Sequence, residues 1–195
     1  MHEYDRIADW YASERLSDPG VPEAMALASS LAPGSLVLDI GCGNGVPITR
    51  CLLNVGHRVV GLDSSSAMLS RFVRNCPEAF AVRGVVQSIP FADGIFDAAI
   101  AWGVMFHLEP QDGVRAIASV SRVIKPGAPF LFTSGDVDDF HGKEDKMNGV
   151  TFRYFSYTRD NYRRILQDHG FALVDVHNDS GDNTYYLARK NGSTG

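Results

Sequence analysis

Three glycines at alternate positions follow an apolar, strand-like segment, and this feature constrains the fold of the chain more than any other. The segment 36–40 is typical of a buried strand, and Gly41, Gly43 and Gly45 come directly after it. A helix-like segment and a second strand follow, and that strand ends at Asp63. The separation of Asp39 and Asp63 is close to the roughly 20 residues of one strand–helix–strand step. The spacing therefore predicts a parallel sheet with a glycine-lined turn at its carboxyl edge.

Strand-like and helix-like segments alternate along the whole chain, which predicts an α/β fold with a mainly parallel sheet. Two short helices are expected first, at 4–11 and 22–33. The further strands are expected at 57–62, 79–82, 96–102, 130–133, 171–176 and 184–188. Within one domain at 1–190, we expect a helical cap at 1–33 and a lid or substrate loop at 135–157, which lacks periodicity. The polar end at 191–195 is predicted to be a disordered tail.

Charge and composition exclude several classes of protein. The chain has 195 residues, a formal net charge of −5 and a pI near 5.6, so it has no electrostatic basis for holding nucleic acid. Its longest apolar stretch, 95–108, is shorter than the roughly 20 residues of a membrane helix, and no membrane partner is expected. The amino terminus lacks a secretory signal and the three cysteines form no CxxC pair, which favours a cytoplasmic location. The sequence leaves the oligomeric state open.

The glycines and the acidic residues together predict a ligand of the adenosine type. Glycine is required where a bulky ligand lies against the backbone, and a carboxylate at the next strand end can accept both hydroxyls of a ribose. The dinucleotide fingerprint GxGxxG would place its third glycine at Val46, so the match to that fingerprint is incomplete. Asp39 puts a negative charge beside the turn, which suits a ligand with an ammonium or sulfonium group better than a pyrophosphate.

With these features in place, the sequence resembles the class I S-adenosylmethionine-dependent methyltransferases. The matching segments, in the family's order, are 37–45, 61–69, 89–91 with 96–97, and 125–127. The resemblance covers residues 4–190 and implies a single-domain, Rossmann-like fold: a seven-stranded, mostly parallel sheet whose last strand is antiparallel, with helices on both faces. It also implies S-adenosylmethionine as the cofactor and methyl transfer to a small-molecule acceptor by in-line displacement. A non-catalytic S-adenosylmethionine-binding protein and, less favoured, an NAD(P)-dependent oxidoreductase are the alternatives.

The resemblance assigns roles to residues near the glycine turn. Gly41, Cys42 and Gly43 would line the methionine end of the cofactor, and Asp63 would hold its ribose. The remaining expected cofactor contacts are Tyr11, Ser64, Met68, Val86, Gln87 and Trp102.

Two of these expected contacts rest on special arguments. Val85 stands where the family often has an acid for the adenine amino group, so backbone groups near Val86, with Gln87, are expected to replace it. Trp102 is open to two interpretations, a shield for the sulfonium through cation–π attraction or a core aromatic residue at a strand end.

The acceptor side of the site is predicted from one histidine and two tyrosines. His107 lies in a loop after a strand and is either a base for acceptors that must lose a proton or a structural group that bonds the first loop. Tyr154 and Tyr157, both within the lid, are expected to line the acceptor pocket, and an aromatic lining indicates a small, partly apolar acceptor. The acidic residues and His141 of the lid lack the spacing of metal ligands, so no metal site is predicted.

Overall fold

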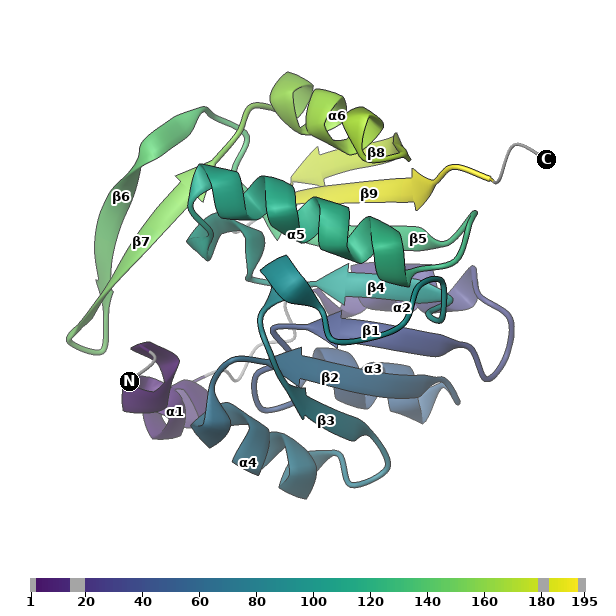
Figure 1. Ribbon diagram of the computed structural model, residues 1–195. Coiled ribbons are helices and arrows are strands. Elements are labelled where there is room, and N and C mark those ends of the chain that lie inside the picture. The colour runs from purple at the N-terminus through teal and green to yellow at the C-terminus, as the bar shows by residue number, and fades with distance from the viewer. Residues whose placement is uncertain (1–2, 15–19, 179–182, 193–195) are drawn as a thin grey trace.

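A mostly parallel sheet of seven strands organises the molecule, and a two-stranded hairpin projects from it (Figure 1). The computed structural model describes residues 3–14, 20–178 and 183–192. The helices are α1 (Glu3–Glu14), α2 (Val21–Ser29), α3 (Ile48–Asn54), α4 (Ser66–Asn75), α5 (Pro110–Val123) and α6 (Arg159–Asp168), with short 3₁₀ helices η1 (Val86–Ser88) and η2 (Met105–His107). The strands are β1 (Leu36–Ile40), β2 (Arg58–Asp63), β3 (Phe80–Arg83), β4 (Ala98–Ala101), β5 (Pro129–Ser134), β6 (Asp139–Met147), β7 (Val150–Ser156), β8 (Phe171–Asn178) and β9 (Thr184–Lys190).

The seven-stranded sheet has the order β3-β2-β1-β4-β5-β9-β8. Neighbouring strands are parallel from β3 to β5, and β9 is antiparallel to both β5 and β8. The predicted fold, including its antiparallel last strand, is therefore confirmed. The chain leaves β1 for β2 on one side and later adds β4 on the other, so the strand order reverses beside β1. Open α/β sheets bind their ligands at the carboxyl edge of such a switch point.

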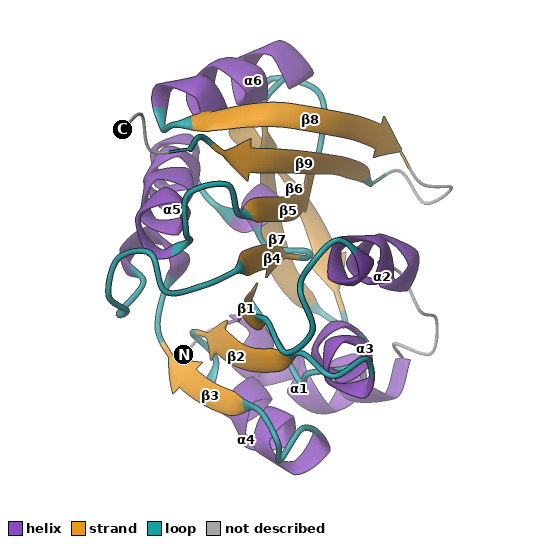
Figure 2. Ribbon diagram, turned by 90° about the vertical axis from the view of Figure 1, so that its right-hand side faces the viewer, coloured by secondary structure: helices purple, strands orange, loops and turns teal. Residues whose placement is uncertain are grey.

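Helices cover both faces of the sheet (Figure 2). Helices α5 and α6 pack on one face, whereas α2 and α3 pack on the other. Successive residues of β1 serve the two faces in turn, because Val37 belongs to the cluster under α2 and α3 and Leu38 to the cluster under α5 and α6. Both side chains are fully buried, which explains why β1 is apolar on both faces apart from Asp39.

The structure corrects the expectation of an irregular loop at 135–157, because this segment contains a β-hairpin. Strands β6 and β7 pair antiparallel, with Met147 opposite Val150. Asn148 and Gly149 connect them with φ angles of 46° and 75°, as a two-residue type I′ turn requires. The Asn-Gly pair is the sequence signal that predicts such a hairpin. The hairpin leaves the main sheet and crosses toward α1 at the edge where β1, β2 and β4 end (Figure 1).

The two chain ends bear on the remaining boundary predictions. Helices α1 and α2 lie within the expected cap at 1–33, but α1 packs on α4 and β7, whereas α2 packs against α3. The expected disordered tail begins with an anchored residue, since the Asn191 N–H donates to the Gly170 carbonyl at 2.8 Å. Its residues 193–195 lie outside the described part of the chain. None of the described helices is long and apolar enough to cross a membrane.

Candidate active site

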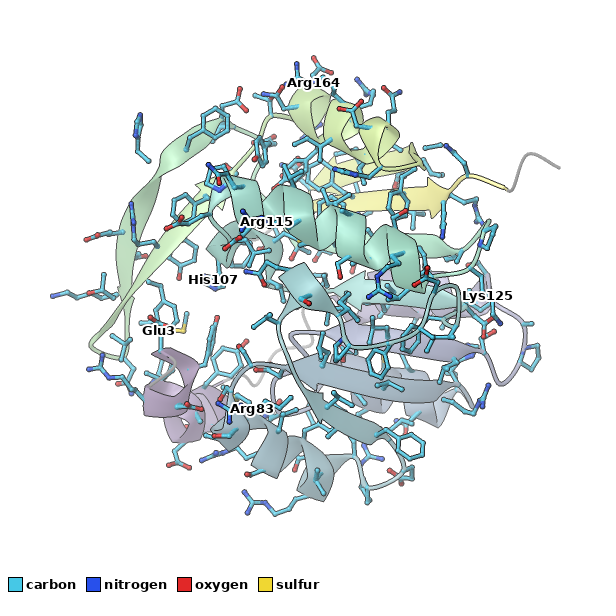
Figure 3. The ribbon with its side chains drawn as sticks, in the orientation of Figure 1. Glu3, Arg83, His107, Arg115, Lys125 and Arg164 are labelled. Carbon is cyan, nitrogen blue, oxygen red and sulfur yellow. The ribbon has the colours of Figure 1, made fainter. Side chains whose placement is uncertain are left out.

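A cavity of about 550 Å³ lies at the carboxyl edge of the sheet, under α1 and the β6–β7 hairpin. In Figure 3, Glu3 and His107 border the open region between α1 and the hairpin, and both residues line this cavity. The residues that the sequence assigned to the cofactor or to catalysis all line it as well: Tyr11, Gly41, Cys42, Gly43, Asp63, Ser64, Met68, Val86, Gln87, Trp102 and His107. Residues distant in the sequence thus meet at one place.

The glycine turn after β1 forms the floor of the cavity, and its glycines serve different purposes. Gly41 has φ 63° and donates its N–H to the Leu62 carbonyl at 2.7 Å, which ties the turn to β2. A Cβ atom on Gly41 would lie 2.2 Å from the Val104 side chain, so the chain there must be glycine for packing. Gly43 has φ 54°, and a Cβ atom on it would meet nothing within 4 Å. Since Gly43 lines the cavity, a side chain there would take up space next to the backbone that a ligand can use.

The Asp63 carboxylate joins the turn to the start of α4. Its Oδ2 accepts the Gly43 N–H at 2.9 Å, and its Oδ1 accepts the Ser65 N–H at 2.8 Å. Ser65 in turn caps α4, because its side-chain oxygen accepts the Met68 N–H at 3.1 Å. These bonds fix the carboxylate at the cavity surface, where its oxygens act as acceptors, as a ribose hydroxyl requires.

The charge near the glycine turn depends on two buried side chains, those of Asp39 and Cys42. Asp39 is 2% exposed, and its Oδ2 accepts a hydrogen bond from the Thr49 hydroxyl of α3. Burial raises the pKa of the Cys42 thiol well above its usual value, and the charges of Asp39 and Asp63 raise it further. Cys42 therefore stays a neutral thiol at neutral pH and is not an activated nucleophile.

The end of the cavity beside α4 is mainly apolar. Met68 and Val86 are 1% and 5% exposed, and Val85, which replaces the expected acid, also lines the cavity.

Helix α1 is anchored on the first turn of α4. Asp5 of α1 accepts hydrogen bonds from the Ser65 hydroxyl and, at 3.2 Å, from the Ala67 N–H.

A second, smaller cavity of about 190 Å³ adjoins the first. The two cavities share Tyr4, Tyr11, Trp102, Gly103 and His107. Residues that line the second cavity alone are Phe106, Thr133, Met147, Tyr154 and Asn183. The structure thus brings Tyr154 to the chamber next to the main cavity, as an acceptor contact requires.

His107 lies between α1 and the hairpin, and its hydrogen bonds define its tautomer. Its Nδ1 is 3.4 Å from the Arg153 carbonyl oxygen, which can only accept, so Nδ1 carries the hydrogen. Its Nε2 is 2.9 Å from the Tyr4 hydroxyl, which therefore donates to it in the neutral form of the ring. These two bonds link His107 to α1 and to β7, and the expected bond to the first loop stays a prediction.

Trp102 is part of the core and also faces the cavities. It is 8% exposed, and its ring lies 4.8 Å from that of Tyr185. A Cβ atom on Gly20 would lie 2.5 Å from the Trp102 ring, so α2 packs tightly on it. Its place as a core aromatic residue is thereby established, while its contact with a sulfonium stays a prediction.

Tyr157, which was predicted to line the acceptor pocket, lines neither of the two cavities. Its hydroxyl donates to the Pro110 carbonyl at 2.6 Å, and its ring packs 5.3 Å from the rings of Phe140 and Tyr162. Tyr157 follows the end of β7, where the hairpin returns to α5 and α6, and so it supports the hairpin base.

The sequence analysis missed the polar residues that α1 and the hairpin bring to the cavity. These are Glu3 and Tyr4 of α1 and Glu144, Thr151 and Arg153 of the hairpin; Glu109, which directly precedes α5, also lines the cavity and was missed. Tyr4 lies on the same helix face as Tyr11, so the sequence pattern could have placed Tyr4 in the cavity. The hairpin residues could be placed there only once the hairpin was known. Among the described residues, no three His, Cys, Asp or Glu side chains come together as a ligand set for a metal ion.

Comparison with known proteins agrees with the motifs and the fold. Residues 37–127 match the family model of a methyltransferase domain. An uncharacterized methyltransferase of Synechocystis sp. is 38% identical over 101 residues, which are 52% of this chain and 47% of that protein. A tRNA (carboxymethyluridine(34)-5-O)-methyltransferase of Arabidopsis thaliana is 33% identical over 131 residues, 67% of this chain and 31% of that protein. The chain thus spans half or less of the length of these curated relatives.

A solved structure supports the same fold. The 1,6-didemethyltoxoflavin-N1-methyltransferase of Burkholderia thailandensis, solved with 1,6-didemethyltoxoflavin and S-adenosylhomocysteine bound, superposes with a TM-score of 0.74. The identity is 20%, and the match covers 97% of this chain and 87% of the other. The ordered motifs, the matched family model and the sheet order agree with one another: the chain belongs to the class I S-adenosylmethionine-dependent methyltransferases.

Proposed function

We propose that this chain takes a methyl group from S-adenosylmethionine and transfers it to a small-molecule acceptor. The observation that carries the proposal is the floor of the main cavity. Gly43 exposes its backbone there with free space where a Cβ would stand, and the fixed Asp63 carboxylate lies beside it. An open glycine backbone next to a carboxylate that accepts hydrogen bonds at a strand end is the arrangement that an adenosyl ligand with a ribose needs.

The residues present fit that cofactor at each of its parts. Asp63 would accept the ribose hydroxyls, Gly41 to Gly43 would face the methionine part, and Met68 and Val86 would flank the adenine. When bound, S-adenosylmethionine supplies an electrophilic methyl group, and attack by an acceptor electron pair leaves a neutral thioether. The chain's own contribution is to align the acceptor with that methyl group and to exclude water, and alignment of this kind contributes about 7–11 kcal/mol in favourable cases.

A small acceptor is favoured by the dimensions and charge of the site. The chamber beside the main cavity is about 190 Å³, and α1 and the hairpin border it. A net charge of −5 opposes binding of a nucleic acid, although some relatives are named for a tRNA.

We further propose a cytoplasmic location, which the free thiols of Cys42, Cys51 and Cys76 support.

Tyr4 and His107 would receive a proton when the acceptor has one to lose. The Tyr4 hydroxyl can accept from an acceptor in the chamber while it donates to His107 Nε2. The Arg153 carbonyl holds the other ring nitrogen and would stabilise the imidazolium that forms. A positioned base of this kind typically contributes a factor of about 10²–10⁴ to the rate.

Two measurements test the proposed function. Calorimetry with S-adenosylmethionine, S-adenosylhomocysteine and NAD should show binding of the first two and none of NAD; binding of NAD alone would favour the oxidoreductase. A methyl-transfer screen over small O-, N- and S-acceptors should then yield at least one product. Complete silence in that screen, with the cofactor bound, would favour the non-catalytic binding protein.

His107→Gln and Tyr4→Phe separate the proton role from binding. Both should lower kcat, the first by about 10²–10⁴ and the second by less, while S-adenosylhomocysteine affinity changes little. Equal kcat values for the wild type and His107→Gln would remove His107 from the reaction.

A further inference from the structure

We infer that the 190 Å³ chamber binds small amines in their protonated form, so that the acceptor of this protein is an amine. The inference rests on the proposed function, since it names the acceptor class of the same site. It is carried by the kind of side chains that line the chamber, by the charges that are missing from it, and by the charges around the adjoining cavity.

Aromatic rings form most of the chamber wall. Tyr4, Tyr11, Trp102, Phe106 and Tyr154 line it together with the imidazole of His107. Tyr4 and Tyr11 stand at an interplanar angle of 88°, and Phe106 and Tyr154 face each other at 36° with 5.7 Å between their centroids. Rings in such different orientations surround a small group with several π-systems, an arrangement that attracts an ammonium group.

The described lining of the chamber offers an anionic acceptor no Lys or Arg as a charged partner. Among the described residues that line it, none is Lys, Arg, Asp or Glu. A carboxylate or phosphate would lose its hydration there without gaining a counter-charge, whereas an ammonium group gains the ring faces. Tyr4, Tyr11, Thr133 and Asn183 add polar groups that can bond a hydroxyl or a carbonyl elsewhere on a small molecule.

The larger cavity, which adjoins the chamber, is predominantly negative. Its acidic lining residues are Glu3, Asp39, Asp63, Glu109 and Glu144. Arg153 is the one Lys or Arg among its described lining residues, and its Nε lies 4.0 Å from the Glu144 carboxylate. A cavity lined mostly by one sign of charge concentrates the opposite ion, so cations are concentrated next to the chamber.

Proton balance is consistent with an amine acceptor. The bound ammonium gives one proton through the Tyr4 hydroxyl to Nε2 of His107. The freed electron pair on nitrogen would then form the new N–C bond to the methyl group of bound S-adenosylmethionine, and the pair of the broken C–S bond would return to sulfur. The positive charge would thereby move from sulfur to nitrogen, and the product would again be an ammonium ion beside the rings.

Binding of three isosteric probes tests the inference. The probes are 2-(dimethylamino)ethanol, a cation at pH 7; 3-methylbutan-1-ol, its neutral isostere; and 3-methylbutanoate, an anion. Calorimetry of the full chain should show the amine binding about tenfold more tightly than the alcohol, as cation–π contacts predict, and the anion binding more weakly still. Equal affinities for amine and alcohol, or tighter binding of the anion, would overturn the inference.

Variants locate the preference in the chamber. Tyr154→Leu and Phe106→Leu remove one ring each and should reduce the preference for amine over alcohol by about threefold to tenfold, while Tyr154→Phe should keep it. Phe140→Leu is the matched control, because Phe140 is an exposed hairpin ring that lines neither cavity. An amine preference that persists in both Leu variants would place the amine elsewhere and refute the chamber.

The titrations are run with and without saturating S-adenosylhomocysteine, so the two proposals fail separately. Absence of S-adenosylhomocysteine binding would refute the proposed function, and the amine preference would still be measured in the free protein. Binding of S-adenosylhomocysteine without any amine preference would refute the acceptor class alone.

Discussion

The two sides of the main cavity are built in different ways. One side, here called the sheet wall, consists of the glycine turn 41–45, Asp63 and the start of α4, and it continues directly from fully buried strands. The other side, the cap wall, consists of α1 and the β6–β7 hairpin. Its own apolar cluster is small, with Ile7, Val150 and Phe152 as the buried members.

The two walls also differ in how they are attached. The sheet wall shares the backbone hydrogen bonds of β1 and β2, whereas the cap wall reaches the body mainly through side chains. Asp5 bonds Ser65 and Ala67, and His107 bonds Tyr4 on one side and the Arg153 carbonyl on the other. Elements with few buried contacts open at lower free energy than the core. We therefore expect the sheet wall, which would hold most of the cofactor, to be the more rigid, and the cap wall, which would face the acceptor, to open more readily.

The largest expected effect comes from filling the open space of the sheet wall. Gly43→Val places a branched side chain where the Cβ meets nothing but the cavity, so S-adenosylhomocysteine affinity should fall by more than about 100-fold. Calorimetry measures the loss, and circular dichroism checks that the fold remains.

Gly56→Val is the matched control for Gly43→Val. Gly56 has φ 87° and open space around its Cβ, but it lies in the turn before β2, at the opposite edge of the sheet. Both variants carry backbone strain of about 1–3 kcal/mol, and only the first should lose the ligand. Equal losses of affinity would mean that strain, not occupied space, explains the result.

Removing the carboxylate of the sheet wall should have the next largest effect. Asp63→Ala loses the acceptor for the Gly43 and Ser65 N–H groups and for the ribose, so affinity should fall by about 1–3 kcal/mol, or roughly 5- to 150-fold. Asp97→Ala is its control, since Asp97 accepts the Leu36 N–H at 2.8 Å at the amino end of β1. Unchanged affinity in Asp63→Ala, measured by the same calorimetry, would refute the ribose assignment.

A smaller effect is expected from loosening the cap wall. Asp5→Ala removes the acceptor for the Ser65 hydroxyl and the Ala67 N–H, a capping interaction of about 1 kcal/mol. Hydrogen exchange of the α1 amides should accelerate, with only a modest loss of S-adenosylhomocysteine affinity. Asp9→Ala removes a nearly fully exposed partner of Arg71 and should leave α1 exchange unchanged. Equal acceleration in both variants would mean that Asp5 is not the anchor.

The difference between the walls also explains what the sequence could predict. The sheet wall follows from local patterns, because an apolar strand, alternating glycines and an acid at the next strand end fix their own geometry. Gly41, Gly43 and Asp63 could therefore be assigned to the cavity from the sequence.

The cap wall depends on contacts between residues far apart in the chain. Nothing local to Tyr4 or Arg153 indicates that His107 lies between them, and Tyr157 falls outside the cavity because of where the hairpin base docks. The Asn148-Gly149 pair is the local sequence signal that predicts the hairpin.

The smallest effect is expected from a substitution in the Asn148-Gly149 turn. It tests whether the cap wall is stabilised independently of the core. Gly149→Ala puts a Cβ at φ 75° in open space, so backbone strain of about 1 kcal/mol is its only expected cost. Amide exchange within β6 and β7 should become roughly fivefold faster, while the melting temperature and S-adenosylhomocysteine affinity stay nearly constant. Gly170→Ala imposes the same strain at φ 78° after α6 and should leave hairpin exchange unchanged. If Gly149→Ala instead lowers the melting temperature and speeds exchange throughout the sheet, the hairpin unfolds together with the core, and the two walls form one cooperative unit.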